Sequence, residues 1–141
     1  MSLFGALTNG LVTINGVNLS SRCKKFEIPQ VTGLGDASGM GNTTKVNVPL
    51  LDEWTLTCDF IEDLAASGAG SVDATLSAIK AGRAAVTVAV RMDAGSISTT
   101  NPEWTGSAVL ANLPLGGTHG TLAMKTGVAF HCAGPLSRNT A

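Results

Sequence analysis

The chain has 141 residues, of which 13% are charged and 44% are hydrophobic, and its formal net charge is −1. This length suits a single domain, residues 1–141, and the near-neutral charge excludes a basic face of the kind that neutralises nucleic-acid phosphates. Globular chains average about 25% charged residues. We therefore expect much of this poorly charged surface to be buried against partners.

The first elements are short and extended. Residues 1–10 have no basic start and only scattered apolar residues, so they predict neither a signal peptide nor a membrane span. An apolar run over residues 11–14 ends at Asn15-Gly16, a strong hairpin-turn pair because both positions tolerate positive φ. Residues 22–28 predict a strand that ends before Pro29.

A glycine-rich stretch, VTGLGDASGMGNTT, covers residues 31–44. We expect it to be a long loop, and loops of this length are usually functional or disordered. A phosphate-binding loop is excluded because the Gly-Lys-Ser/Thr ending is missing and no helix follows. An extended pattern resumes over residues 45–48.

The clearest strand covers residues 53–61. Its alternation places Trp54, Leu56, Cys58 and Phe60 on a core face and Glu53, Thr55, Thr57 and Asp59 on the other.

A single helix is predicted over residues 72–81. Ser71 is a suitable N-cap, Val72, Leu76 and Ile79 form an apolar stripe, and Gly82 suits the position after the last turn.

Three more strands follow, over residues 84–91, 103–113 and 121–132. Alternation places Val86, Val88 and Val90 inward on the first of them, and Leu122, Met124, Val128 and Phe130 on one face of the last. The tail after Gly134-Pro135 has little to pack. Six or seven strands and one helix predict a mainly β fold, a β-sandwich or barrel-like sheet with one flanking helix. The predicted core is Trp54, Leu56, Phe60, Leu76, Val88 and Phe130.

No constellation of catalytic or metal-binding residues is apparent. His119 lies in a glycine-rich turn and His131 on a strand, and no pattern links either to a nucleophile. Cys23, Cys58 and Cys132 are widely spaced and read as structural thiols of a reducing compartment. We interpret Glu62-Asp63 as a solvated strand end, since calcium-loop spacing is missing. The sequence predicts neither an enzyme nor a cofactor.

Two of the predicted strands contain a long stretch without charge. Residues 84–90 and 106–113 contain no charged side chain, whereas exposed sheet edges are normally blunted by lysine or proline. Either these strands are central, or their edges meet another subunit in a closed ring.

Several segments together resemble the tail tube (major tail) proteins of long-tailed bacteriophages. They are LVTINGVNL at the start, RCKKFEIPQV leading into the glycine-rich stretch, the Trp-Thr-Leu-Thr strand from Trp54 and the TLAMKTGVAF ending. The resemblance implies a β-sandwich with a flanking helix, six copies of which form a ring. The inner sheets would join into a ring-spanning barrel, and stacked rings would form the tube through which the genome passes.

The resemblance also implies roles for particular segments. The loop of residues 31–44 would reach the adjacent ring, through Gly33, Gly35, Asp36, Gly39, Met40 and Gly41. Residues 1–10 and 134–141 would be terminal arms, and Glu27, Glu53 and Asp59 would face an acidic lumen. The implied partners are further copies, a tail-tip initiator, a tape-measure protein, a terminator and DNA in passage, with no membrane. The implied location is the virion tail, assembled in the host bacterial cytoplasm.

Two alternatives remain open. An inner tube of a contractile system, or of a gene-transfer particle, fits the same residues. A β-sandwich binding module of adhesin or carbohydrate-binding type is the other, although such modules usually expose aromatic side chains. Here both Trp residues fall on alternating faces that we expect to be buried, and Tyr is absent.

Overall fold

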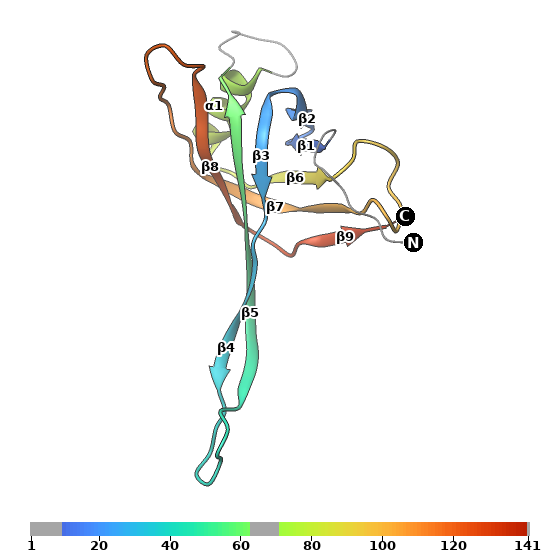
Figure 1. The fold of residues 1–141 in the computed structure, drawn as a ribbon, viewed down its shortest axis with the longest axis vertical. Coiled ribbons are helices and arrows are strands. Elements are labelled where there is room, and N and C mark those ends of the chain that lie inside the picture. The colour runs from blue at the N-terminus through green and yellow to red at the C-terminus, as the bar shows by residue number, and fades with distance from the viewer. Residues whose placement is uncertain (1–9, 63–70, 141) are drawn as a thin grey trace.

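The computed structural model describes residues 10–62 and 71–140 of the chain. Strands make up 52% and helix 11%, and the strands belong to one curled sheet that forms a half-barrel (Figure 1). The predicted fold class, mainly β with a barrel-like sheet and one helix, is confirmed.

The sheet has the strand order β2-β1-β6-β7-β8-β5-β3, with β4 paired to β5 and β9 paired to β7. All of the pairings are antiparallel. The elements are β1 (Leu11–Ile14), β2 (Val17–Asn18), the 3-10 turn η1 (Ser20–Arg22), β3 (Cys23–Glu27), β4 (Gln30–Asp36), β5 (Asn47–Ile61), α1 (Val72–Gly82), β6 (Val86–Arg91), β7 (Glu103–Asn112), β8 (Met124–Cys132) and β9 (Ser137–Asn139).

The β1–β2 hairpin turns at Asn15-Gly16, as the sequence predicts. Both residues have positive φ, 52° at Asn15 and 80° at Gly16, which suits the right-handed twist of the flanking strands.

The core lies between α1 and the face of the sheet that β5 presents to it. Trp54 is 4% exposed, while Leu56 and Phe60 are fully buried, because alternate residues of β5 point to this face. The apolar stripe of α1 belongs to the same buried cluster. All six residues predicted for the core are buried.

Helix α1 extends one residue beyond the predicted end. Gly82 is the last helical residue, and Arg83 adopts the left-handed conformation expected of Gly82, with φ of 53°. The Arg83 amide donates to the Ile79 carbonyl at 3.3 Å, which closes the last turn.

Strand β8 differs from the predicted alternation. Its pairing with β5 shifts between Cys58 and Phe60, where two residues of β8 lie opposite Asp59. Gly127 occupies this bulge with φ of 80°. The shift of one residue turns Lys125 inward, so the prediction that Met124 shares a face with Val128 is wrong. Leu122 precedes the strand and is exposed, so the prediction that it shares a strand face with Val128 and Phe130 is also wrong.

The C-terminal tail is part of the sheet. β9 pairs with the first residues of β7, and Leu136 packs against the core. The prediction that this tail has little to pack is therefore wrong. The N-terminal arm proposed for residues 1–10 lies, apart from Gly10, outside the described residues.

The uncharged stretches 84–90 and 106–113 belong largely to β6 and β7, which are central strands. β6 lies between β1 and β7, and β7 is bounded by β6 on one side and by β8 and β9 on the other. Their backbone groups are therefore paired within the chain, which answers the choice that the sequence left open.

Candidate functional site

A two-stranded ribbon, here called the arm (residues 30–53), projects from the half-barrel (Figure 1). β4 pairs along the first half of β5, whereas β8 pairs with β5 only from Thr55 onward. The Ala37 amide continues the pairing by donating to the Val46 carbonyl at 2.8 Å. The expectation of a loop over residues 31–44 is thus wrong for residues 31–36, which are strand.

The glycines of β4 make room for the apolar side chains of β5. A Cβ atom on Gly35 would lie 3.4 Å from both Leu50 and Val48 side-chain carbons, and one on Gly33 would lie 3.2 Å from the Leu51 carbonyl oxygen. Near the root, the Thr32 hydroxyl donates to the Asp52 carboxylate at 2.8 Å. Leu50 and Val48 therefore cover one face of β4 where glycine leaves it bare.

The tip of the arm is ordered by polar contacts. The Ser38 amide donates to Asp36 Oδ1 at 2.8 Å, and the Val46 amide donates to Ser38 Oγ at 2.6 Å. Hydrogen bonds from the Ser38 backbone and side chain lower the pKa of Asp36 below its ordinary value. Beyond them Gly41 has φ of 91°, and Met40 is fully exposed.

Both faces of the arm are apolar. Leu34 lies opposite Pro49 in register, whereas Val48 and Leu50 lie over Gly35 on the other face. The exposed large hydrophobic side chains of the arm are Val31, Leu34, Met40, Val46, Val48, Leu50 and Leu51. An isolated two-stranded ribbon is marginally stable in water, and contiguous exposed apolar surface marks interaction sites. The arm is therefore the part of the described chain best suited to contact another protein.

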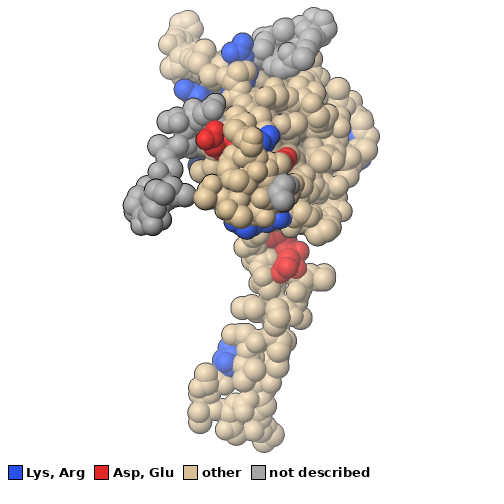
Figure 2. All heavy atoms as spheres, turned by 90° about the vertical axis from the view of Figure 1, so that its right-hand side faces the viewer, with Lys and Arg blue, Asp and Glu red and all other residues tan. Residues whose placement is uncertain are grey.

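Few charges interrupt this surface. Asp36, Lys45, Asp52 and Glu53 are the charged residues of the arm. Figure 2 shows the arm as a mostly uncharged projection with acidic atoms near its root. A partner would cover it without desolvating many ions.

The three candidate lumen residues do not form one cluster. Glu27 and Lys25 lie on β3 opposite Thr57 and Asp59 of β5, on the sheet face away from α1. Lys25 Nζ lies 3.8 Å from Glu27 Oε2 in an exposed ion pair. Asp59 accepts a hydrogen bond from the Gly127 amide at 2.9 Å, which holds the bulge of β8.

Glu53, the third candidate, is separated from the other two. It lies opposite Val31 in the arm and is exposed.

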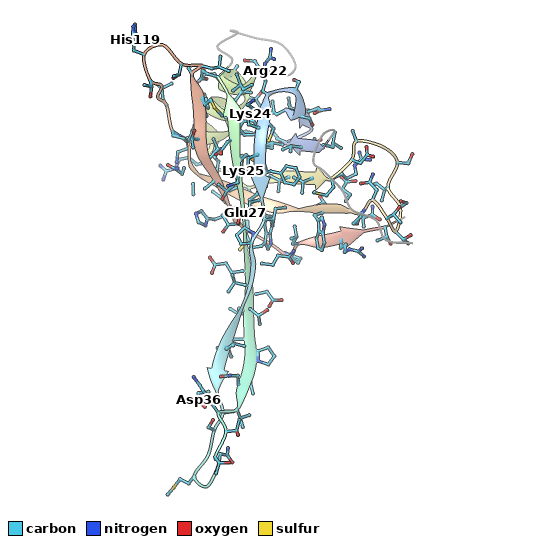
Figure 3. The ribbon with its side chains drawn as sticks, viewed as in Figure 1. Arg22, Lys24, Lys25, Glu27, Asp36 and His119 are labelled. Carbon is cyan, nitrogen blue, oxygen red and sulfur yellow. The ribbon has the colours of Figure 1, made fainter. Side chains whose placement is uncertain are left out.

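Basic side chains mark the edge strand of the half-barrel. Arg22, Lys24 and Lys25 lie along η1 and β3, well above the arm (Figure 3). Charged side chains on an edge strand oppose uncontrolled pairing with other sheets. His119 lies at the tip of the loop before β8, away from the other labelled residues (Figure 3).

An open groove of about 230 Å³ lies beside the root of the arm. Its walls come from residues 26–30 at the junction of β3 and β4 and from β6 and β7, and they include Phe26, Ile28, Arg91 and Trp104. Arg138 of β9 lies over the Trp104 ring, with its guanidinium carbon 5.8 Å from the ring centroid. Sequence alternation did not reveal this groove because it depends on how the sheet curls.

A buried ion cluster is the second feature that sequence reasoning missed. Lys125 Nζ lies 3.2 Å from Glu62 Oε2 and 3.3 Å from Asp73 Oδ1. The side chains of Lys125 and Glu62 are 2% and 7% exposed. The expectation of a solvated strand end is therefore wrong for Glu62, and Asp63 lies outside the described residues. The cluster joins β8, the end of β5 and the first turn of α1.

In residues 10–62 and 71–140, no three His, Cys, Asp or Glu side chains are grouped to hold a metal ion. Within the same residues, no helix has both the length and the apolar character needed to cross a membrane.

The fold was compared with known proteins. No protein-family model and no curated protein sequence matches the chain. A chain in the virion of a native gene transfer agent particle superposes with a TM-score of 0.69 at 12% identity, over 93% of this chain and 95% of that one. A chain in the baseplate of the anti-feeding prophage superposes with a TM-score of 0.57 at 9% identity, over 98% and 97%. The chain thus shares its whole fold with components of two particle assemblies.

Proposed function

We propose that this protein is a structural component of a phage-type particle, a tail tube protein without catalytic activity. Copies assemble into hexameric rings, and the rings stack into a tube that conducts the genome during delivery. The fold shared with a gene transfer agent virion and a prophage baseplate supports a role in such a particle.

The observation that carries the proposal is the apolar, two-faced arm. A ribbon with Leu34 on one face and Leu50 on the other leaves hydrophobic surface in water whichever way it turns. Burial of apolar surface contributes about 25 cal/mol per Å². Contact with another copy would therefore stabilise both the arm and the assembly. In a stack of rings, the arm of one copy reaches the adjacent ring.

The remaining roles follow from the same proposal. Residues 1–10 and 134–141 contribute further contacts between copies, and Glu27, Glu53 and Asp59 line the lumen. A tail-tip initiator, a tape-measure protein and a terminator bound the tube, and DNA meets it only in passage. Assembly takes place in the bacterial cytoplasm, and the finished protein resides in the virion tail.

A β-sandwich binding module of adhesin or carbohydrate-binding type is the competing function. Such a module needs accessible aromatic rings, and Trp54 is buried. The expectation that both Trp residues are buried is wrong for Trp104, which is half-buried and lines the open groove, but Arg138 lies over its ring. Efficient acrylamide quenching of both indoles would favour the module over the tube.

The experiment that tests the role of the arm is a matched pair of substitutions. Leu51 is 88% exposed in the arm, and Leu115 is 80% exposed outside it. Leu51→Ser should raise the critical concentration for assembly about tenfold or more, because full burial of a leucine is worth about 1.5–3 kcal/mol. Leu115→Ser should leave it unchanged. Sedimentation and light scattering report assembly, and circular dichroism checks that both variants fold. Equal behaviour of the two variants would count against an assembling arm.

A further inference from the structure

Cys23 and Cys58 lie on neighbouring strands at the edge of the half-barrel. In the β3–β5 register, Cys23 is opposite Phe60 and Cys58 is opposite Phe26, so both cysteines point to the core face. A register shift between Cys23 and Lys25 places a bulge next to the first cysteine. The two side chains also interact, since each is the largest influence on the pKa of the other.

Access differs between the two thiols. Cys58 is buried in the core, whereas Cys23 is only partly buried at the start of the edge strand. Cys23 Sγ also lies 3.3 Å from the Lys25 carbonyl oxygen, which holds its side chain on the bulge. A small oxidant can therefore reach Cys23 but not Cys58.

We propose that Cys23 and Cys58 are a dithiol pair that closes to an intramolecular disulfide by exchange with a low-molecular-weight disulfide. The Cys23 thiolate attacks one sulfur of the oxidant, forms a mixed disulfide and releases one small thiol. Cys58 gives up its proton and attacks the Cys23 sulfur, which releases the second small thiol. One disulfide is reduced to two thiols, while two protein thiols become one disulfide.

The electrostatics favour this order of steps. The hydrogen bond with Cys58 lowers the pKa of Cys23, although burial and Asp59 act in the opposite direction. The same hydrogen bond and burial raise the pKa of Cys58. Because the thiolate is the nucleophile, Cys23 attacks first and Cys58 acts as the resolving thiol. Cys132 lies on β8 opposite Ala108 of β7 and takes no part.

The product would join the edge strand β3 to β5 a few residues above the root of the arm. Because the reaction takes place within one chain, it needs no partner copy and does not depend on the proposed function. A covalent link between these strands should shift the urea midpoint of unfolding upward, and a reductant should reverse the shift.

The test incubates the folded full-length chain with oxidised glutathione, then denatures and alkylates it. The expected product is monomeric, has lost the mass of two hydrogen atoms, and carries one alkylated cysteine, Cys132. Peptide mapping should find the Cys23–Cys58 cross-link. Three alkylatable cysteines, a lasting glutathione adduct on Cys23, or a cross-link that includes Cys132 would each overturn the proposal.

Three variants sharpen the result. Cys132→Ser should still form the cross-link in full. Cys58→Ala should stop at a stable glutathione adduct on Cys23, since no resolving thiol remains. Cys23→Ser should leave Cys58 unmodified because it is buried. Rapid modification of Cys58 in folded Cys23→Ser would show that Cys23 is not the attacking thiol.

Discussion

Gly106 and Trp54 are in such close contact that a Cβ atom on Gly106 would lie 2.6 Å from Cζ2 of the indole. The same Cβ would lie 3.0 Å from the Pro135 carbonyl oxygen. The indole Nε1 of Trp54 donates to the Gly134 carbonyl at 2.8 Å. Because position 106 is glycine, the ring of Trp54 can pack against β7. The indole N–H in turn holds the segment that leads into β9.

Gly106→Ala should destabilise the fold by about 1–3 kcal/mol, because overpacking forces the indole or the chain to move. Gly116→Ala is the matched control, since a Cβ there meets nothing within 4 Å. The control should change stability by no more than about 0.5 kcal/mol. Urea unfolding followed by tryptophan fluorescence measures both. Equal stability of the two variants would show that the space around Trp54 is not restrictive.

Lys125→Met should cost about 3–5 kcal/mol, because it leaves the buried Glu62 carboxylate without its cation. Asp73→Asn should cost less, about 0–1 kcal/mol, since its side chain is 36% exposed and water screens the pair. The double variant Lys125→Met, Glu62→Leu should recover most of the stability that Lys125→Met loses. Urea unfolding midpoints and slopes give these values. A loss below about 1 kcal/mol for Lys125→Met would contradict a buried, energetically important cation.

Acidification should loosen the tip of the arm. The folded-state pKa of Asp36 is lowered by hydrogen bonds from Ser38, so the ionised carboxylate stabilises the tip. This contribution is complete above the ordinary aspartate pKa of about 4 and is lost as the pH falls through the lowered folded value. An NMR titration should find the pKa of the Asp36 carboxyl below its ordinary value, and Ser38→Ala should raise this pKa. An unchanged titration in Ser38→Ala would show that the Ser38 hydroxyl does not lower this pKa and would leave the Ser38 amide as its cause.

Sequence patterns predict the buried face of an element correctly where a strand or helix periodicity continues without interruption. The alternation from Trp54 to Phe60 and the apolar stripe of α1 predict the faces that the structure buries. Asn15-Gly16 predicts its turn because the required positive φ is a property of those two residues.

Sequence patterns were insufficient where contacts between distant segments decide the outcome. Gly33 and Gly35 have low strand propensity, yet they form strand because Leu50 and Val48 across the ribbon fill the space that their missing side chains leave. By alternation along the strand, Lys125 would face solvent. The bulge at Gly127 turns it inward instead, where Glu62 and Asp73 balance its charge. Neither the strand conformation of the two glycines nor the inward turn of Lys125 is indicated by a local sequence pattern.

Cryo-electron microscopy of the purified full-length protein at high concentration tests the central claim most directly. Tube assembly predicts stacked rings of six copies, in which copies of the adjacent ring cover both faces of each arm and bury Leu51. Strictly monodisperse monomers under all conditions, including nucleation with a tail-tip complex, would contradict it. Tubes in which the arms extend into solvent would contradict it as well.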